Sequence, residues 1–81
     1  MSSNVAEYTP LIVNDVFMVN GRERDYGRLV NQWLRVISLR VDNYGNRHLG
    51  VVSIRDPLFR INDITEYGFN HMGYISKIPR D

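Results

Sequence analysis

The chain has 81 residues, a formal net charge of +1 and no cysteine. The length predicts a single domain with a modest core, and the cysteine count excludes disulfides and thiolate metal sites. No apolar run approaches the ~20 residues that span a bilayer, and the first residues lack a signal-peptide pattern, so we expect a soluble, cytoplasmic protein with no membrane contact.

The first residues predict an arm and then a strand. Residues 1–9 are small, polar or mixed and are expected to form an N-terminal arm, which leaves residues 10–81 as one small β-rich domain. Residues 16–19 form a short apolar run that predicts a strand. Asn20-Gly21 follows this run and is typical of a two-residue hairpin turn, because such a turn needs positive φ at both positions.

Residues 26–34 allow two interpretations. Apolar residues recur there at the spacing of a one-sided helix, namely Tyr26, Leu29, Val30, Trp33, Leu34 and Ile37. The alternation of Ile37, Leu39 and Val41 with polar residues instead indicates a strand. Either a helix from 26 to about 34 is followed by a strand, or two strands meet near residues 31–32. The helical phase favours burial of Trp33 in the core, while the other interpretation of Trp33 is a platform for a base or a partner.

The second half of the chain predicts a hairpin, a short helix and two more strands. Residues 36–41 and 48–54 are expected to pair antiparallel across a turn at 42–46, and Pro57 ends the second strand. Residues 59–61 predict a further short strand. Asp63 and Glu66 resemble a capping box for a helix over 64–72, and residues 74–78 predict the last strand.

The sequence gives little support for catalysis or metal binding. A hydrolytic site usually needs a nucleophile, a base and an orienting group, whereas the only two histidines, His48 and His71, stand alone. We expect both to be surface or partly buried polar residues. The sequence therefore predicts a protein that is not an enzyme and has no cofactor or metal.

Arginine is the unusual component of this chain, which has nine arginines and one lysine. Eight of the arginines lie between positions 22 and 60, where four acidic residues leave a formal charge of +4. These arginines could simply form the solvated face of a sheet and pair with Asp42 or Asp56. Guanidinium groups are also the preferred cations for phosphate recognition and are enriched at protein interfaces, which indicates an interface.

Two stretches resemble the motifs of Sm and Sm-like proteins. The first comprises residues 20–23 (Asn-Gly-Arg-Glu) and residues 27–30 (Gly-Arg-Leu-Val), and the second is Leu-Gly-Val-Val-Ser-Ile-Arg over residues 49–55, in matching order over residues 16–61. Of the RNA-contacting positions of that family, only Arg55 is matched here. The resemblance implies a five-stranded bent barrel that assembles into a ring by edge-strand pairing and binds single-stranded RNA.

The sequence as a whole predicts a mainly β (α+β) domain, a small antiparallel, bent SH3/Sm-like barrel with short helices that self-associates. The predicted function is non-enzymatic binding of RNA or single-stranded nucleic acid through Arg55 and Arg35, with Asn31 as a base contact. The alternative is a protein–protein interaction or structural accessory protein, such as a small phage or viral component, that binds no nucleic acid.

Overall fold

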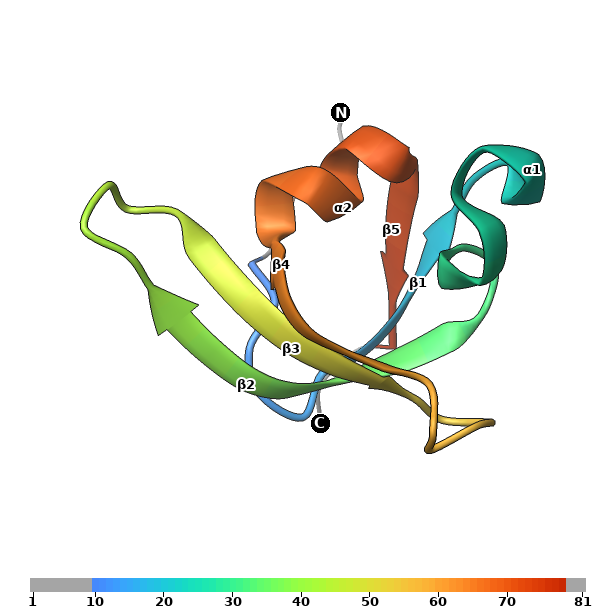
Figure 1. Ribbon diagram of the computed structural model, residues 1–81, viewed down its shortest axis with the longest axis horizontal. Coiled ribbons are helices and arrows are strands. Elements are labelled where there is room, and N and C mark those ends of the chain that lie inside the picture. Colours follow the sequence, from blue (N-terminus) through green and yellow to red (C-terminus); the bar gives the residue numbers. More distant parts are fainter. Residues whose placement is uncertain (1–9, 79–81) are drawn as a thin grey trace, which may run out of the picture.

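The computed structural model describes residues 10–78, so the predicted arm over residues 1–9 lies outside the described residues. Five antiparallel strands form one sheet in the order β4-β3-β2-β1-β5 (Figure 1). The strands are β1 (Val16–Asn20), β2 (Trp33–Val41), β3 (Arg47–Ser53), β4 (Arg60–Thr65) and β5 (Tyr74–Lys77). The helical segments are α1 (Glu23–Tyr26), the 3-10 helix η1 (Gly27–Leu29) and α2 (Glu66–Met72). The prediction of a mainly β fold with short helices is confirmed.

The sheet bends at Gly50, in the middle of β3. The β2–β3 pairing shifts register between Val36 and Ser38, and the β3–β4 pairing shifts between Leu49 and Val51. Such β-bulges bend the strand and increase its twist. A Cβ atom on Gly50 would collide with the Ser38 hydroxyl and lie 3.3 Å from the Asn62 carbonyl oxygen, so glycine lets both neighbouring strands approach closely at the bend.

The hydrophobic core lies between the concave face of this sheet and α2. Alternate residues of β1, β2 and β3 are buried because successive side chains of a strand point to opposite faces; the buried ones are Phe17, Val19, Leu34, Val36, Leu49 and Val51. Phe69 of α2 packs edge-on against Phe17 with ring centroids 5.2 Å apart. Burying one phenylalanine side chain stabilises a fold by about 1.5–3 kcal/mol, so this contact is a principal attachment of α2 to the sheet.

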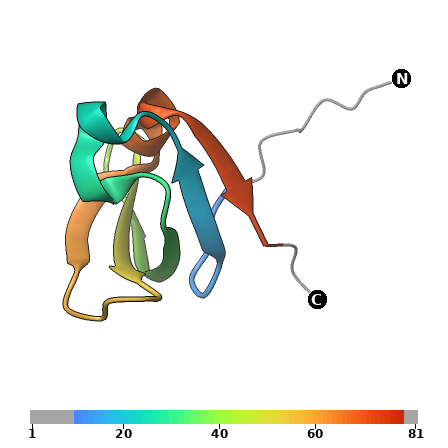
Figure 2. The same cartoon turned by 90° about the vertical axis from the view of Figure 1, so that its right-hand side faces the viewer.

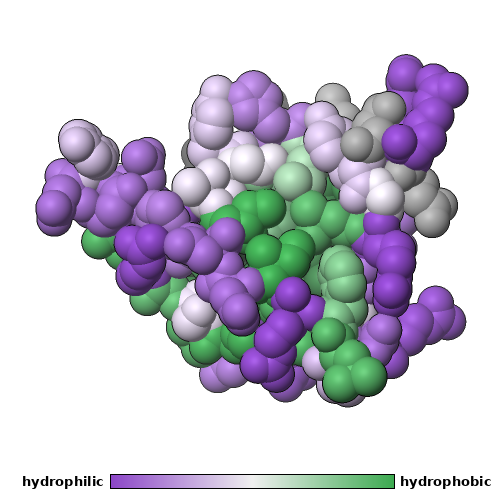
Figure 3. Space-filling model, in the orientation of Figure 1, coloured by the Kyte–Doolittle hydropathy of each residue, from purple (hydrophilic) through white to green (hydrophobic). Residues whose placement is uncertain are grey.

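The sheet is open, and the prediction of a closed barrel was wrong. β4 and β5 are the two edges of the sheet, and Figure 2 shows β5 beside β1, at the end of the sheet away from β4. The connection between the two edge strands is α2, which covers the core with a helix instead of with β4–β5 hydrogen bonds. Apolar side chains are visible below α2 in Figure 3, and partly buried residues packed against the core include Phe59, Ile61 and Ile64.

The prediction of a hairpin turn at Asn20-Gly21 was also wrong. The chain continues from β1 into α1 and η1, and it enters β2 only at Trp33. The observed positive φ angles in this region belong to Gly27 (60°) and Asn31 (62°). Neither interpretation of residues 26–34 is complete, because the helical turns end at residue 29 and the strand begins at residue 33.

The predicted capping box is replaced by a simpler cap. Thr65 is the N-cap of α2, and its hydroxyl accepts a hydrogen bond from the backbone N–H of Gly68 at 3.1 Å. Asp63 remains within β4. Among residues 10–78, no helix combines the length and apolar character needed to cross a bilayer.

A buried carboxylate connects three distant parts of the chain. Glu66, at the start of α2, is only 6% exposed. One of its carboxylate oxygens accepts a hydrogen bond from Nε of Arg47 at 2.8 Å, and the other accepts one from the backbone N–H of Leu11 at 2.8 Å. Arg47 also donates to the backbone carbonyl of Leu11. The network holds residue 11, the start of β3 and α2 together.

We predict that Arg47→Ala lowers the free energy of unfolding by about 3 kcal/mol, because it leaves the Glu66 carboxylate buried without its cation. Arg40→Ala is the control, since Arg40 forms an exposed ion pair with Asp63 and exposed pairs contribute at most about 1 kcal/mol. Urea unfolding measures both. Equal losses in the two variants would contradict this role for Arg47.

Candidate functional site

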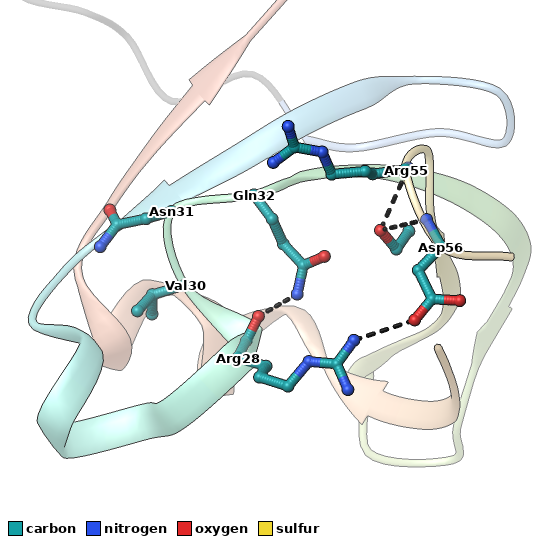
Figure 4. Close-up of a pocket in the computed structure, with 7 residues that line it drawn as sticks. Arg28, Val30, Asn31, Gln32, Arg55 and Asp56 are labelled. Carbon is teal, nitrogen blue, oxygen red and sulfur yellow. Dashed lines mark hydrogen bonds and ion pairs between the residues drawn. The ribbon is translucent and has the colours of Figure 1, made fainter. Parts of the chain in front are cut away.

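A hollow of about 240 Å³ lies between the η1–β2 connection and the β3–β4 turn. Seven residues line it, and Figure 4 draws them: Arg28, Val30, Asn31, Gln32, Ser53, Arg55 and Asp56. Two of the three residues that the sequence predicts as a binding site, Asn31 and Arg55, therefore come together. Six of the seven residues that line the hollow are polar or charged, which suits a polar ligand.

The Asn31 amide is partly committed to holding the backbone. Its nitrogen donates to the carbonyl of Gly21 at 2.9 Å, and its oxygen accepts from the N–H of Gly21 at 3.4 Å. The backbone N–H of Asn31 donates to the carbonyl of Val19 at 2.8 Å. Asparagine tolerates the left-handed φ of 62° that this position requires. Asn31 thus fixes the backbone at one wall of the hollow, and in Figure 4 its amide points away from the other lining side chains.

The opposite wall is shaped by Ser53, the last residue of β3. Its hydroxyl accepts hydrogen bonds from the backbone N–H groups of Arg55 and Asp56, both at 3.2 Å. These bonds turn the chain immediately after the strand. Asp56 in turn accepts from the N–H of Leu58 at 3.2 Å. The turn is therefore held by local bonds and presents the Arg55 side chain at the rim.

The two arginines of the hollow have different surroundings. Arg28 forms an ion pair with Asp56 at 2.9 Å, and its guanidinium carbon lies 5.0 Å from the centre of the Phe59 ring. Arg55 is exposed and makes no side-chain hydrogen bond or ion pair within residues 10–78. In Figure 4 its guanidinium points away from the Arg28–Asp56 pair. Arg55 therefore supplies the uncompensated positive charge of the hollow.

Arg35 lies outside the hollow, although the sequence groups it with the other two predicted residues. It alternates with the buried Leu34 and Val36 along β2 and is exposed on the outer, convex face of the sheet. Its register neighbours are Val16 on β1 and Val52 on β3. Trp33 lies on the same face and is 40% exposed, so the expectation that it belongs to the core was wrong.

Arg28 and Gln32 complete the hollow, but the sequence analysis did not select them. Gln32 donates from its amide nitrogen to the carbonyl of Arg28, and its amide oxygen has no partner within residues 10–78. Both residues come close to Arg55 through the β2–β3 pairing and the η1 turn. The register of that hairpin would have indicated Gln32, because Ile54 donates its N–H to the carbonyl of Trp33 at 3.0 Å, but it carries no signal for Arg28.

A second polar cluster surrounds His48 near the other end of the β2–β3 hairpin. The ring nitrogens of His48 contact carboxylate oxygens of Asp42 at 2.8 Å and Asp63 at 2.7 Å. Arg40 donates to the same Asp63 at 2.9 Å. Within residues 10–78 no three His, Cys, Asp or Glu residues form a group suited to a metal ion. His48 is thus a partly buried polar residue that connects the hairpin turn to β4.

The cluster shifts the pKa values of its members. The hydrogen bond from His48 lowers the pKa of Asp42 to about 2, assisted by the backbone N–H of Asn46. Hydrogen bonds to Asp42 and then to Asp63 raise the pKa of His48 above its usual 6.5. Those from His48 and then Arg40 lower the pKa of Asp63. The charged forms of all three residues therefore favour the folded state.

No protein-family model matches the sequence, and no curated protein or solved structure is significantly similar to it. The resemblance to Sm-like proteins therefore rests on residues 16–61 alone and stays a prediction. One local difference is visible within it. Gly27–Leu29 forms a 3-10 helix here, whereas the corresponding family motif opens a strand.

We predict that stability falls as pH rises from 5.5 to 8.5 and that His48→Gln reduces this fall. Because the pKa of His48 is raised on folding, its contribution is fully present below the unfolded pKa of 6.5 and is lost as pH rises through the folded pKa. The two aspartates contribute above pH 3.8; Asp42 loses its contribution toward its folded pKa of about 2, and Asp63 loses its contribution as pH falls through its lowered pKa. Urea midpoints at pH 5.5 and 8.5 measure the effect; an equal fall in both proteins would argue against the His48 cluster.

Proposed function

We propose that this protein binds RNA or another single-stranded nucleic acid, without catalysing a reaction, through the hollow around Arg55. The observation that carries the proposal is the exposed guanidinium of Arg55, which has no partner within residues 10–78 and lies at the rim of a polar hollow. An arginine whose fork of donors is free can grip a phosphate through two parallel hydrogen bonds. The two other charges of the hollow, Arg28 and Asp56, neutralise each other.

The Gln32 amide supplies a group of the hollow that would contact a base. Its oxygen has no partner within residues 10–78 and can accept a hydrogen bond from the edge of an unpaired base. The Asn31 amide binds the backbone of Gly21 through both its nitrogen and its oxygen, so Asn31 contributes by positioning this wall. The overall charge of only +1 argues for a local site of this kind, because general polyanion binders depend on a large cationic excess.

The open edges of the sheet support self-association of the binding unit. β4 and β5 have unpaired backbone groups along one side, and such edges invite pairing with another chain. Pairing of β4 of one copy with β5 of the next would repeat in one direction, and such a head-to-tail contact forms a ring when the rotation between copies closes. Such a ring is also what the Sm-like resemblance implies.

Protein binding without nucleic acid is the second candidate, and the exposed apolar residues favour it. Large hydrophobic side chains that are at least 40% exposed include Trp33, Ile37, Ile54 and Leu58. Tryptophan and arginine are both enriched in the centres of protein interfaces. A structural accessory protein, such as a small phage or viral component, would use this surface on a protein partner.

We predict that the affinity for a labelled single-stranded RNA falls steeply with salt and that Arg55→Ala weakens it. Losing one phosphate contact lowers the slope of log affinity against log salt by about 0.7. Arg24→Ala is the matched control, since it removes the same charge from an exposed position on α1. Fluorescence anisotropy over a salt series measures both variants. An unchanged affinity for Arg55→Ala, or no RNA binding at any salt, would refute the proposal.

We predict a native mass that is a multiple of the 9.5 kDa chain, consistent with a closed ring. Replacing Asn62, which is exposed in the edge strand β4, with proline should shift the mass to the monomer, because proline removes a backbone donor and is poorly tolerated in paired strands. Native mass spectrometry measures both proteins. A monomeric wild type would remove the ring from the proposal and leave RNA binding to be decided by the anisotropy experiment.

A further inference from the structure

The convex face of the sheet carries two rows of side chains, in which Trp33, Ile54, Arg35 and Arg60 are exposed. The β1–β2 and β2–β3 pairings place residues of neighbouring strands side by side on this face. The first row is Met18, Trp33 and Ile54, and the second is Val16, Arg35, Val52 and Arg60. Their strand neighbours Phe17, Leu34 and Val51 are buried on the opposite face. Because side chains alternate along a strand, the two rows lie on the convex face.

The first row is apolar and has an aromatic ring in its middle. Trp33 is 40% exposed and Ile54 is 46% exposed, while Met18 is partly buried between them and β5. Trp33 stands in register with Met18 of β1 on one side and is paired through the backbone with Ile54, just after β3, on the other. The indole therefore has an apolar neighbour on each adjacent segment and presents surface to solvent, as a stacking platform requires.

The second row is positively charged and contains no acid. Arg35 and Arg60 both stand in register with Val52, from the strands on either side of it. Neighbouring strands lie about 4.8 Å apart, so the backbone positions of these two arginines are about 10 Å apart. Neither makes an ion pair or side-chain hydrogen bond within residues 10–78, whereas Arg28, Arg40 and Arg47 each pair with a carboxylate.

The first row lies at the same end of the β2–β3 pairing as the hollow. Gln32 of the hollow precedes Trp33 in the chain, and Ile54 precedes Arg55. Ser53 of the hollow is buried on the concave side of the sheet, whereas Trp33 and Ile54 are exposed on the convex side. A chain molecule that passes from Arg55 around this end of the sheet would meet Trp33 first and the Arg35–Arg60 pair next. The order of contacts is a cation, a flat aromatic surface and then two cations.

We propose that a single-stranded nucleic acid bound at the hollow runs across this convex face, with a base stacked on Trp33 and its phosphates held by Arg35 and Arg60. The inference rests on the proposed function and extends the same site. Charge complementarity selects this occupant, because the two rows offer cations and an aromatic ring but no acid. Single-strand binding proteins combine the same two elements, a cationic path and aromatic platforms.

Trp33 is the only tryptophan in the chain, so its fluorescence reports on the platform alone. The probe is a twelve-nucleotide oligouridylate, unlabelled for fluorescence and labelled for anisotropy. We expect its binding to quench the Trp33 emission, since a stacked base is in contact with the indole. Trp33→Leu should weaken binding roughly tenfold, whereas Trp33→Phe, which keeps a ring, should stay within about threefold. Urea unfolding of each variant checks that it folds.

The arginine row is tested separately, so that the proposal does not depend on one substitution. The double variant Arg35→Gln/Arg60→Gln should lower the slope of log affinity against log salt by about 1.4, because two phosphate contacts are lost. Arg22→Gln/Arg24→Gln removes the same charge from exposed positions before and within α1 and should leave the slope unchanged.

The outcomes separate this inference from the proposed function. If the oligouridylate binds in an Arg55-dependent way but leaves the Trp33 emission and the affinities of the Trp33→Leu and Arg35→Gln/Arg60→Gln variants unchanged, the path across the convex face is wrong and the hollow stands. If the oligonucleotide does not bind at any salt, both fall. If Trp33→Leu lowers the native mass without changing the affinity, the face is an interface between copies, which also overturns the inference.

Discussion

The buried Glu66 carboxylate is the constraint on which the arrangement of the sheet depends. Taking a carboxylate out of water is costly unless its oxygens are fully paired, and here Arg47 and the backbone of Leu11 provide those partners. Meeting that requirement fixes the start of α2 beside the start of β3. With Phe69 packed on Phe17, the helix then covers the concave face, so β4 and β5 remain apart as open edges. The availability of those edges for self-association is a consequence of the buried network.

The elements that could be predicted are those determined by local contacts. The β2–β3 hairpin follows from alternating apolar residues around a turn, and Asp42 fixes that turn by accepting N–H groups from Tyr44 and Asn46 at 2.8 and 2.9 Å. The secondary structure of residues 20–34 was not predicted correctly, because two different local structures share one apolar spacing there. Leu29 packs against the core from η1, whereas Trp33 starts a strand and faces outward. The apolar residues of this segment therefore have the spacing of one continuous helix, although the segment contains only single helical turns.

The site was predictable only in so far as it depends on that hairpin. Asn31 and Arg55 lie near each other because Trp33 and Ile54 are paired, which the predicted strands come close to specifying. The Arg28–Asp56 pair spans 28 positions and the Arg47–Glu66 pair spans 19, and neither separation has a sequence signal. The displacement of Arg35 to the convex face is different, because its alternation with Leu34 and Val36 could have indicated it once a strand was assigned.

The fold divides a uniform-looking set of arginines into two groups with different physical roles. Arg28, Arg40 and Arg47 each join segments that are distant in the chain, and their charges are neutralised by carboxylates. Arg35, Arg55 and Arg60 lack such partners within residues 10–78 and lie on the hollow or on the adjoining convex face. A guanidinium suits both roles, since its planar fork can be satisfied by a carboxylate inside the protein or by a phosphate outside it. Arginine content alone therefore could not separate the paired arginines from the unpaired ones within residues 10–78; the positions of nearby acids in the folded chain do.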